Sequence, residues 1–174
     1  MVYHSHLPPV EIPEVPLTDF VFEHALDEPD TPAIINGETG YVLTYRALVG
    51  SVAAWSTALG ALGVATGTVC AIYAPNSPEY AVVFYAIAKV GGIVTTVNPL
   101  YTVSELTHQL RDSNATVLIA APHLMHTASE AATLAGVRDV LALSPLDDVV
   151  TPTMVRKPCG SMAESRMVSY VWPP

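Results

Sequence analysis

The alternation of two hydrophobic patterns after residue 68 restricts the possible folds of this chain more than any other feature. Apolar runs rich in β-branched residues alternate with segments that have a helical pattern. The runs are continuous rather than polar at every second position, which indicates strands buried on both faces. Strands that alternate with helices form a parallel sheet with helices on both sides. The sequence therefore predicts an α/β fold with strands at residues 69–73, 93–97, 116–120 and 137–143.

The segments between these strands carry residues that favour the beginning of a helix. Ser77, Pro78 and Glu79 supply an N-cap residue, a proline at the first helical position and an acid in the first turn. Thr102 and Glu105 have the spacing of a capping box. A third helix is predicted for residues 122–134, so that a helix connects each strand to the next.

Two elements are predicted before the first long helix. Thr18 and Asp19 are expected to cap a helix that runs to about Glu28. Two short apolar runs, residues 33–35 and 41–43, flank a turn that contains two glycines. This pattern predicts a β-hairpin.

The first long helix is predicted to begin after Thr44 and to end at Gly63, which is suited to the position after a helix C-terminus. Gly60, Gly63 and Gly67 loosely resemble a dinucleotide-binding loop, but such a loop follows a strand and opens a helix. Here the order is the reverse, which favours helix termination. One face of this helix is apolar and consists of Leu48, Val52, Trp55, Leu59 and Leu62.

Composition divides the chain into an extended proline-rich arm (1–17), a globular region (18–150) and a tail (151–174) that has no readable period and is expected to be poorly ordered. The net charge is −9, and residues 1–30 contain seven acids without a lysine or arginine. No basic stripe is present, which excludes nucleic acid as an expected partner. The longest apolar stretch (81–97) is interrupted by a lysine and two glycines, so no transmembrane segment is predicted.

The polar residues of the globular region do not form a recognisable catalytic set. His123 and His126 have a spacing that can share a metal, but no third ligand is evident nearby. Cys70 lies in an apolar run and is interpreted as a small buried apolar residue. The two cysteines, Cys70 and Cys159, do not make a disulfide framework. A reduced, cytoplasmic setting is therefore expected. The remaining histidines are interpreted as surface or structural residues: His4, His6, His24 and His108.

Activation of a carboxylate by a nucleotide requires clustered donors and positive charge at the phosphates. Lys89 lies near a predicted helix C-terminus, where a cation suits the helix dipole. The motifs Gly-x-Ser-x-Gly and Gly-x-x-x-x-Gly-Lys-Ser/Thr do not occur. We therefore predict no catalytic, cofactor-binding or metal-binding residues in this sequence. The basic residues of the globular region are only four and are scattered: Arg46, Lys89, Arg111 and Arg138.

An alternative interpretation is a small ligand-binding domain of the flavodoxin type. Such folds bind ligands at the carboxyl ends of parallel strands. Residues 75–77 and 98–100 follow two predicted strands and carry polar groups that could contact a ligand. The same residue types also serve as turn and cap residues.

Several sequence segments resemble the 4-coumarate–CoA ligases and their relatives in the adenylate-forming superfamily. Residues 73–80 (Tyr-Ala-Pro-Asn-Ser-Pro-Glu-Tyr) and 91–102 (Gly-Gly-Ile-Val-Thr-Thr-Val-Asn-Pro-Leu-Tyr-Thr) carry the resemblance most clearly. Residues 6–13, 32–37 and 43–45 are similar to that family in the same order. The resemblance extends over about residues 5–145, which identifies the chain as the N-terminal part of such a ligase domain.

The resemblance implies an enzyme that uses ATP and Mg²⁺ to convert a carboxylic acid to an acyl-adenylate and then transfers the acyl group to coenzyme A. In that family the phosphate loop, the acyl pocket and the catalytic lysine lie beyond the matched segment. We therefore expect a truncated fragment that is inactive alone, caused by a frameshift or a read-through intron near residue 146. Some relatives are peroxisomal, but no C-terminal targeting tripeptide is present. A third possibility is an interaction module that docks on a paralogue or on a separately encoded remainder.

Overall fold

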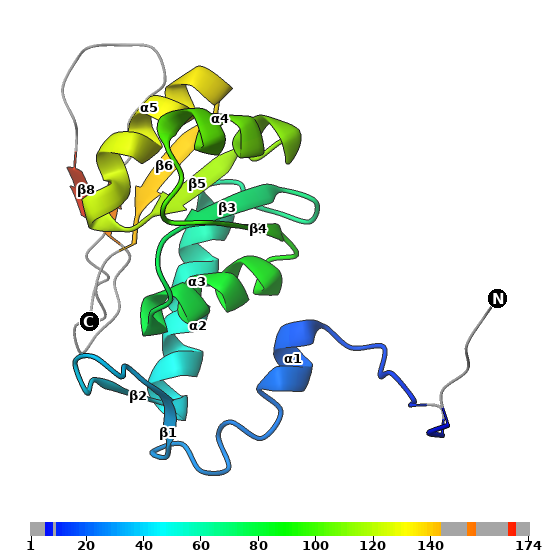
Figure 1. Ribbon diagram of the computed structural model, residues 1–174. Coiled ribbons are helices and arrows are strands. Elements are labelled where there is room, and N and C mark those ends of the chain that lie inside the picture. The colour runs from blue at the N-terminus through cyan, green and yellow to red at the C-terminus, as the bar shows by residue number, and fades with distance from the viewer. Residues whose placement is uncertain (1–5, 9, 144–152, 156–166, 170–174) are drawn as a thin grey trace.

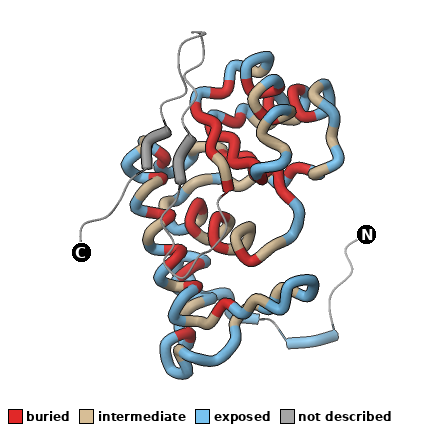
Figure 2. The backbone as a smooth tube through the Cα atoms, turned by 90° about the vertical axis from the view of Figure 1, so that its left-hand side faces the viewer, coloured by how far each residue is buried: buried red, intermediate tan, exposed pale blue. Residues whose placement is uncertain are grey.

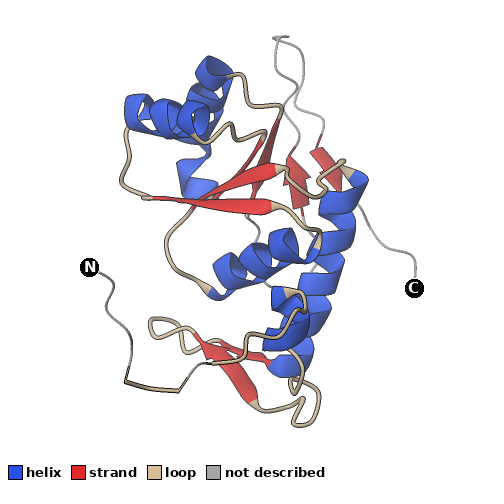
Figure 3. Cartoon of the chain, turned by 90° about the vertical axis from the view of Figure 1, so that its right-hand side faces the viewer, coloured by secondary structure: helices blue, strands red, loops and turns tan. Residues whose placement is uncertain are grey.

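The computed structural model describes residues 6–8, 10–143, 153–155 and 167–169. A four-stranded sheet lies between two layers of helices, and a β-hairpin lies beyond one of these layers (Figure 1, Figure 3). No helix in the described ranges is both long and apolar enough to cross a membrane.

The strands of the central sheet are β3 (Val69–Tyr73), β4 (Ile93–Val97), β5 (Val117–Ala120) and β6 (Asp139–Ala142). They are parallel and lie in the order β4-β3-β5-β6. The connecting helices are α3 (Pro78–Lys89), α4 (Val103–Asp112) and α5 (Met125–Ala135). The predicted α/β fold with a parallel sheet is confirmed.

Each face of the sheet has its own apolar core because successive side chains of a strand point to opposite faces. Cys70 and Ile72 of β3 belong to the core under α3 and α2 (Tyr45–Ala61). Ala71 and Tyr73 belong to the core under α4 and α5. All four residues are buried, which explains why the strand reads as a continuous apolar run. Burial concentrates along the central strands (Figure 2).

The predicted hairpin and the helix after it are also present. Strands β1 (Pro32–Ile35) and β2 (Val42–Thr44) pair antiparallel. The Thr44 side chain accepts a hydrogen bond from the Ala47 N–H at 3.3 Å and caps α2. Gly63 follows the C-terminus of α2 with φ of +83°. Both ends of α2 therefore follow from its capping residues.

The first predicted helix is wrong in its cap and its length. Helix α1 spans only Leu17–Val21. It begins before the predicted cap, because the Pro16 carbonyl accepts the first hydrogen bonds, from Asp19 and Phe20. Thr18 therefore lies inside the helix, where its side chain is buried. After Val21 the chain continues in turns with bonds to the third residue back, such as Ala25 N–H to the Phe22 carbonyl.

The helix predicted at 122–134 is divided. A single 3-10 turn, η1 (Pro122–Leu124), precedes α5, and no side chain caps α5. Gly136 ends α5 in the left-handed conformation. The chain therefore begins to coil at Pro122 as predicted, but its first turn is a 3-10 turn and the α-helix begins only at Met125.

Most of the tail lies outside the described residues. The prediction that the tail is poorly ordered concerns those residues and stays a prediction. The described part consists of β7 (Thr153–Val155) and β8 (Met167–Ser169), which pair antiparallel. The sequence pattern gave no indication of this pairing.

Candidate functional site

A hollow of about 440 Å³ lies at the carboxyl ends of β3 and β4. Both segments that were considered as possible ligand contacts, 75–77 and 98–100, contribute to its wall or flank it. Tyr80 of α3 and Thr96 of β4 complete its polar lining. The lining residues carry no formal charge: Ala74, Pro75, Asn76, Tyr80, Thr96, Val97, Asn98 and Pro99.

The polar groups around this hollow already serve the local structure. The Asn98 Oδ1 accepts a hydrogen bond from the Leu100 N–H at 3.0 Å, which closes a turn. The Ser77 Oγ accepts one from the Tyr80 N–H at 3.2 Å, which caps α3. Burial raises the pKa of the Tyr80 phenol, and its hydrogen bond with Thr96 acts in the opposite direction. These contacts agree with turn and cap chemistry.

The N-terminus of α3, beside the hollow, is poorly suited to a phosphate group. An anion site at a helix end uses backbone N–H groups of the first turn. Pro78 has no N–H, and the Tyr80 N–H already donates to Ser77. Glu79 adds a negative charge to the same turn. The residues here therefore do not fit the triphosphate that the family resemblance implies.

The hollow also lies away from the point where ligands of open α/β sheets bind. In the order β4-β3-β5-β6 the connections diverge between β3 and β5. At that place the Ala121 N–H donates to the Tyr73 carbonyl at 3.0 Å. The Tyr73 hydroxyl donates to the Tyr101 carbonyl at 2.8 Å. The backbone bond between Ala121 and Tyr73 thus continues the pairing of β3 with β5 to the divergence point.

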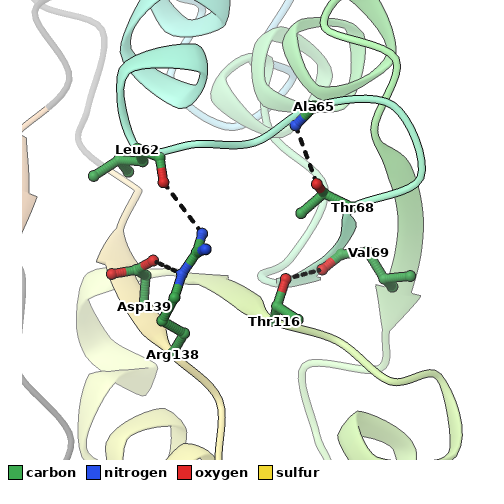
Figure 4. A network of polar contacts seen from close by, with 7 residues as sticks. All are labelled: Leu62, Ala65, Thr68, Val69, Thr116, Arg138 and Asp139. Carbon is green, nitrogen blue, oxygen red and sulfur yellow. Dashed lines mark hydrogen bonds and ion pairs between the residues drawn. The ribbon is translucent and has the colours of Figure 1, made fainter.

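The arginines of the globular region make structural contacts. Arg46 pairs with Asp30 at 3.1 Å, which raises the pKa of its guanidinium, and Arg111 donates to the Leu134 carbonyl at 2.6 Å. Arg138 pairs with Asp139 and donates to the Leu62 carbonyl at 3.2 Å, so it joins β6 to the end of α2 (Figure 4). These cations come from separate elements and do not converge.

The candidate metal ligands and nucleophiles are equally dispersed. His123 and His126 are exposed, and the described residues contain no group of three possible metal ligands. His24 contacts Asp27 at 3.0 Å on the surface. Burial raises the pKa of the Cys70 thiol to about 11, which keeps it protonated and unreactive at neutral pH. His4 and Cys159 lie outside the described residues.

Comparison with known proteins identifies the family. The profile described as "AMP-binding enzyme" matches residues 21–165. The chain belongs to this family. It is 37% identical over 122 residues to 4-coumarate–CoA ligase 5 of Oryza sativa subsp. japonica, which covers 70% of this chain and 23% of the relative. A long-chain-fatty-acid–CoA ligase of Salmonella typhimurium is 36% identical over 133 residues, and the match covers 75% of this chain and 23% of that relative.

Solved structures of AMP-binding enzymes share the fold. A long-chain-fatty-acid–CoA ligase from Archaeoglobus fulgidus superposes with a TM-score of 0.73 and 25% identity, over 80% of this chain and 29% of that one. An anthranilate–CoA ligase in complex with anthranoyl-AMP superposes with a TM-score of 0.65 and 23% sequence identity. The match covers 72% of this chain and 24% of that one. The resemblance to the N-terminal part of an adenylate-forming ligase is confirmed. The chain spans about a quarter of the length of these relatives.

Proposed function

We propose that this chain forms the N-terminal scaffold of an ATP-dependent acyl- or aryl-CoA ligase. The reaction joins a carboxylic acid to AMP with release of pyrophosphate, and then transfers the acyl group to coenzyme A with release of AMP. The observation that carries the proposal is that most of the chain matches, in sequence and in fold, relatives named as CoA ligases.

Within such a ligase this segment acts by positioning rather than by chemistry. Its caps and two apolar cores fix the strands, while its described polar groups serve turns and helix ends. ATP, Mg²⁺ and coenzyme A would have to be held by residues other than those described. We therefore propose that the chain is inactive alone.

Exchange of labelled pyrophosphate into ATP tests this inactivity directly. The purified 174-residue chain is mixed with ATP, Mg²⁺ and either a cinnamate-like or a fatty acid. We expect exchange at the level of a protein-free blank. Exchange that is clearly above the blank, and that requires the acid, would contradict the proposal of inactivity.

A chimera tests the scaffold role separately. The corresponding segment of Arabidopsis thaliana 4-coumarate–CoA ligase 4, which is 37% identical over 123 residues, is replaced by this chain's residues 21–143. We expect a folded chimera with measurable ligase activity, because the buried contacts within the segment are retained. A chimera that folds but has lost all activity would show that this segment supplies more than scaffold.

A ligand-binding domain of the flavodoxin type is the second candidate, and the hollow at the carboxyl ends of β3 and β4 is the observation in its favour. Fluorescence titration with FMN and with ATP distinguishes the two candidates. A scaffold leaves flavin fluorescence unchanged, whereas a binding domain gives a saturable change that Tyr80→Ala abolishes. Docking on a ligase paralogue, the third candidate, is tested by co-purification.

A further inference from the structure

Strand β4 lies at an edge of the central sheet, and a side chain of α4, Gln109, contacts its outer side. In the described part of the chain it pairs with β3 on one side only. Its five residues, Ile-Val-Thr-Thr-Val, are all β-branched, and Ile93 is 52% exposed. Residues 90–104 contain no charged side chain. Proteins usually protect a sheet edge with a lysine, a proline or a bulge, and β4 has none of these.

The hydrogen bonds at the start of β4 show which of its backbone groups face outward. The Ile93 N–H donates to the Thr68 carbonyl at 2.8 Å, and the Gly91 carbonyl accepts from the Gly67 N–H at 3.1 Å. Odd-numbered residues therefore face β3. Because the direction alternates along a strand, Val94 and Thr96 direct their N–H and C=O groups away from the sheet.

Gln109 of α4 confirms this direction. Its Nε2 donates to the Thr96 carbonyl at 2.9 Å and to the Thr95 Oγ1 at 3.0 Å. The Thr96 carbonyl is thus accessible to a donor outside the sheet. It retains a second lone pair, since a carbonyl oxygen can accept two hydrogen bonds.

We propose that the outer edge of β4 pairs antiparallel with β4 of a second copy of this chain. A two-fold axis at Thr95 places Val94 of each copy opposite Thr96 of the other. Both residues face outward, so the two pairs exchange four hydrogen bonds. Ile93 then lies opposite Val97, and the two Thr95 side chains meet. The result is one continuous eight-stranded sheet, with four strands from each copy.

Charge and chemistry favour a second copy at this edge. In this register a charge at position 94, 95 or 96 would lie opposite, or diagonally next to, the same charge of the second copy, and such like charges repel. The absence of charges from 90 to 104 removes that repulsion. Threonine pairs and pairs of β-branched residues are favourable across strands. The pairing does not depend on the proposed ligase function.

Sedimentation equilibrium of the full 174-residue chain tests the proposal. We expect the apparent mass to rise with concentration from 18.5 kDa toward twice that value. Thr96→Pro removes an outward N–H without removing a bond to β3. It should weaken dimerisation about thirtyfold, because two of the four bonds are lost at roughly 1 kcal/mol each. The control Thr96→Val keeps the N–H and should still dimerise.

Amide exchange measured by NMR provides a readout that needs no substitution. The N–H groups of Val94 and Thr96 should exchange more slowly at high than at low protein concentration, while exposed amides of α1 do not change. A chain that stays monomeric throughout overturns the proposal. Equal dimerisation by a folded Thr96→Pro variant also overturns it. So does a monomer in which these two amides are protected only by an added ligase remainder.

Discussion

At the scale of single residues, the structure explains why glycine occupies positions 91 and 92 of the segment that resembles the ligases. The sequence identified this pair as part of a segment that resembles the ligases and as an interruption of an apolar stretch, without a packing reason. In the structure Gly91 has φ of +78°, and a Cβ there would lie 2.6 Å from the Thr66 Oγ1. A Cβ on Gly92 would lie 2.7 Å from the Ile87 Cγ2 and 3.1 Å from the Ile87 carbonyl oxygen. The requirement depends on neighbours that only the folded chain brings close.

Gly92→Ala should therefore destabilise the fold by roughly 1–3 kcal/mol, the usual cost of forcing extra atoms into a packed site. Gly50→Ala is the matched control, because Gly50 lies in α2 with nothing within 4 Å of an added Cβ. It should stabilise the chain by up to about 1 kcal/mol through helix propensity. Urea unfolding of both variants measures the difference. Equal midpoints for the two variants would contradict the packing argument.

The capping box of α4 predicts a pH dependence. The Glu105 carboxylate accepts hydrogen bonds from the Thr102 N–H at 2.8 Å and from its hydroxyl at 2.7 Å, and these lower the pKa of Glu105 below its ordinary value of 4.5. A lowered folded-state pKa gives stability that is present above the unfolded-state pKa and is lost as pH falls through the folded value.

Glu105→Gln should reduce this loss, because the amide oxygen accepts hydrogen bonds but does not titrate. The fall in Tm between about pH 5 and pH 3 should be smaller in the variant than in the parent chain. Thermal melts followed by circular dichroism measure it. Thr102→Ala, which removes one partner, should lower stability by about 1 kcal/mol near neutral pH. Parallel Tm curves for Glu105→Gln and the parent would show that this carboxylate does not contribute.

At the scale of elements, β3 and β4 were predicted with their observed bounds because glycines and turns delimit continuous apolar runs. The α1 region was mispredicted because Thr18 and Asp19 offer cap chemistry that the chain does not use. Pro16 supplies the first accepting carbonyl instead, and Thr18 is buried. Local sequence names the possible caps. Burial, which depends on the packing of α1 against α3, decides among them.

The buried face of α2 gives a prediction at this scale. Leu59 is fully buried in the core between α2 and the sheet, whereas Leu134 of α5 is 53% exposed. Leu59→Ala should cost about 2–5 kcal/mol, since it removes buried methyl groups and leaves a cavity. Leu134→Ala should change stability by less than about 0.5 kcal/mol. Chemical denaturation compares this matched pair, and similar losses in both would refute the assignment of the core face.

At the scale of the whole molecule, the sequence predicted the parallel sheet and its two covering layers but not the order of its strands. Alternating strands and helices are compatible with several orders. The observed order places β3 and β5 at the centre and leaves β4 at an edge. The two segments of the hollow, 75–77 and 98–100, were named from the sequence, but their adjacency depends on the pairing of β3 with β4, which the sequence did not specify. The sequence did predict that polar residues of these segments serve as turn and cap residues, as Asn98 and Ser77 do.

The central position of Cys70 makes its thiol a reporter of global opening. Cys70 is fully buried in β3, which has neighbours on both sides. In a Cys159→Ser background, a thiol reagent should label Cys70 only in molecules that have opened globally, so the labelling rate should follow the free energy of unfolding. Leu59→Ala should accelerate labelling strongly and Leu134→Ala should not. Rapid labelling of the unmutated core, at a rate insensitive to denaturant, would mean that the sheet opens locally at β3.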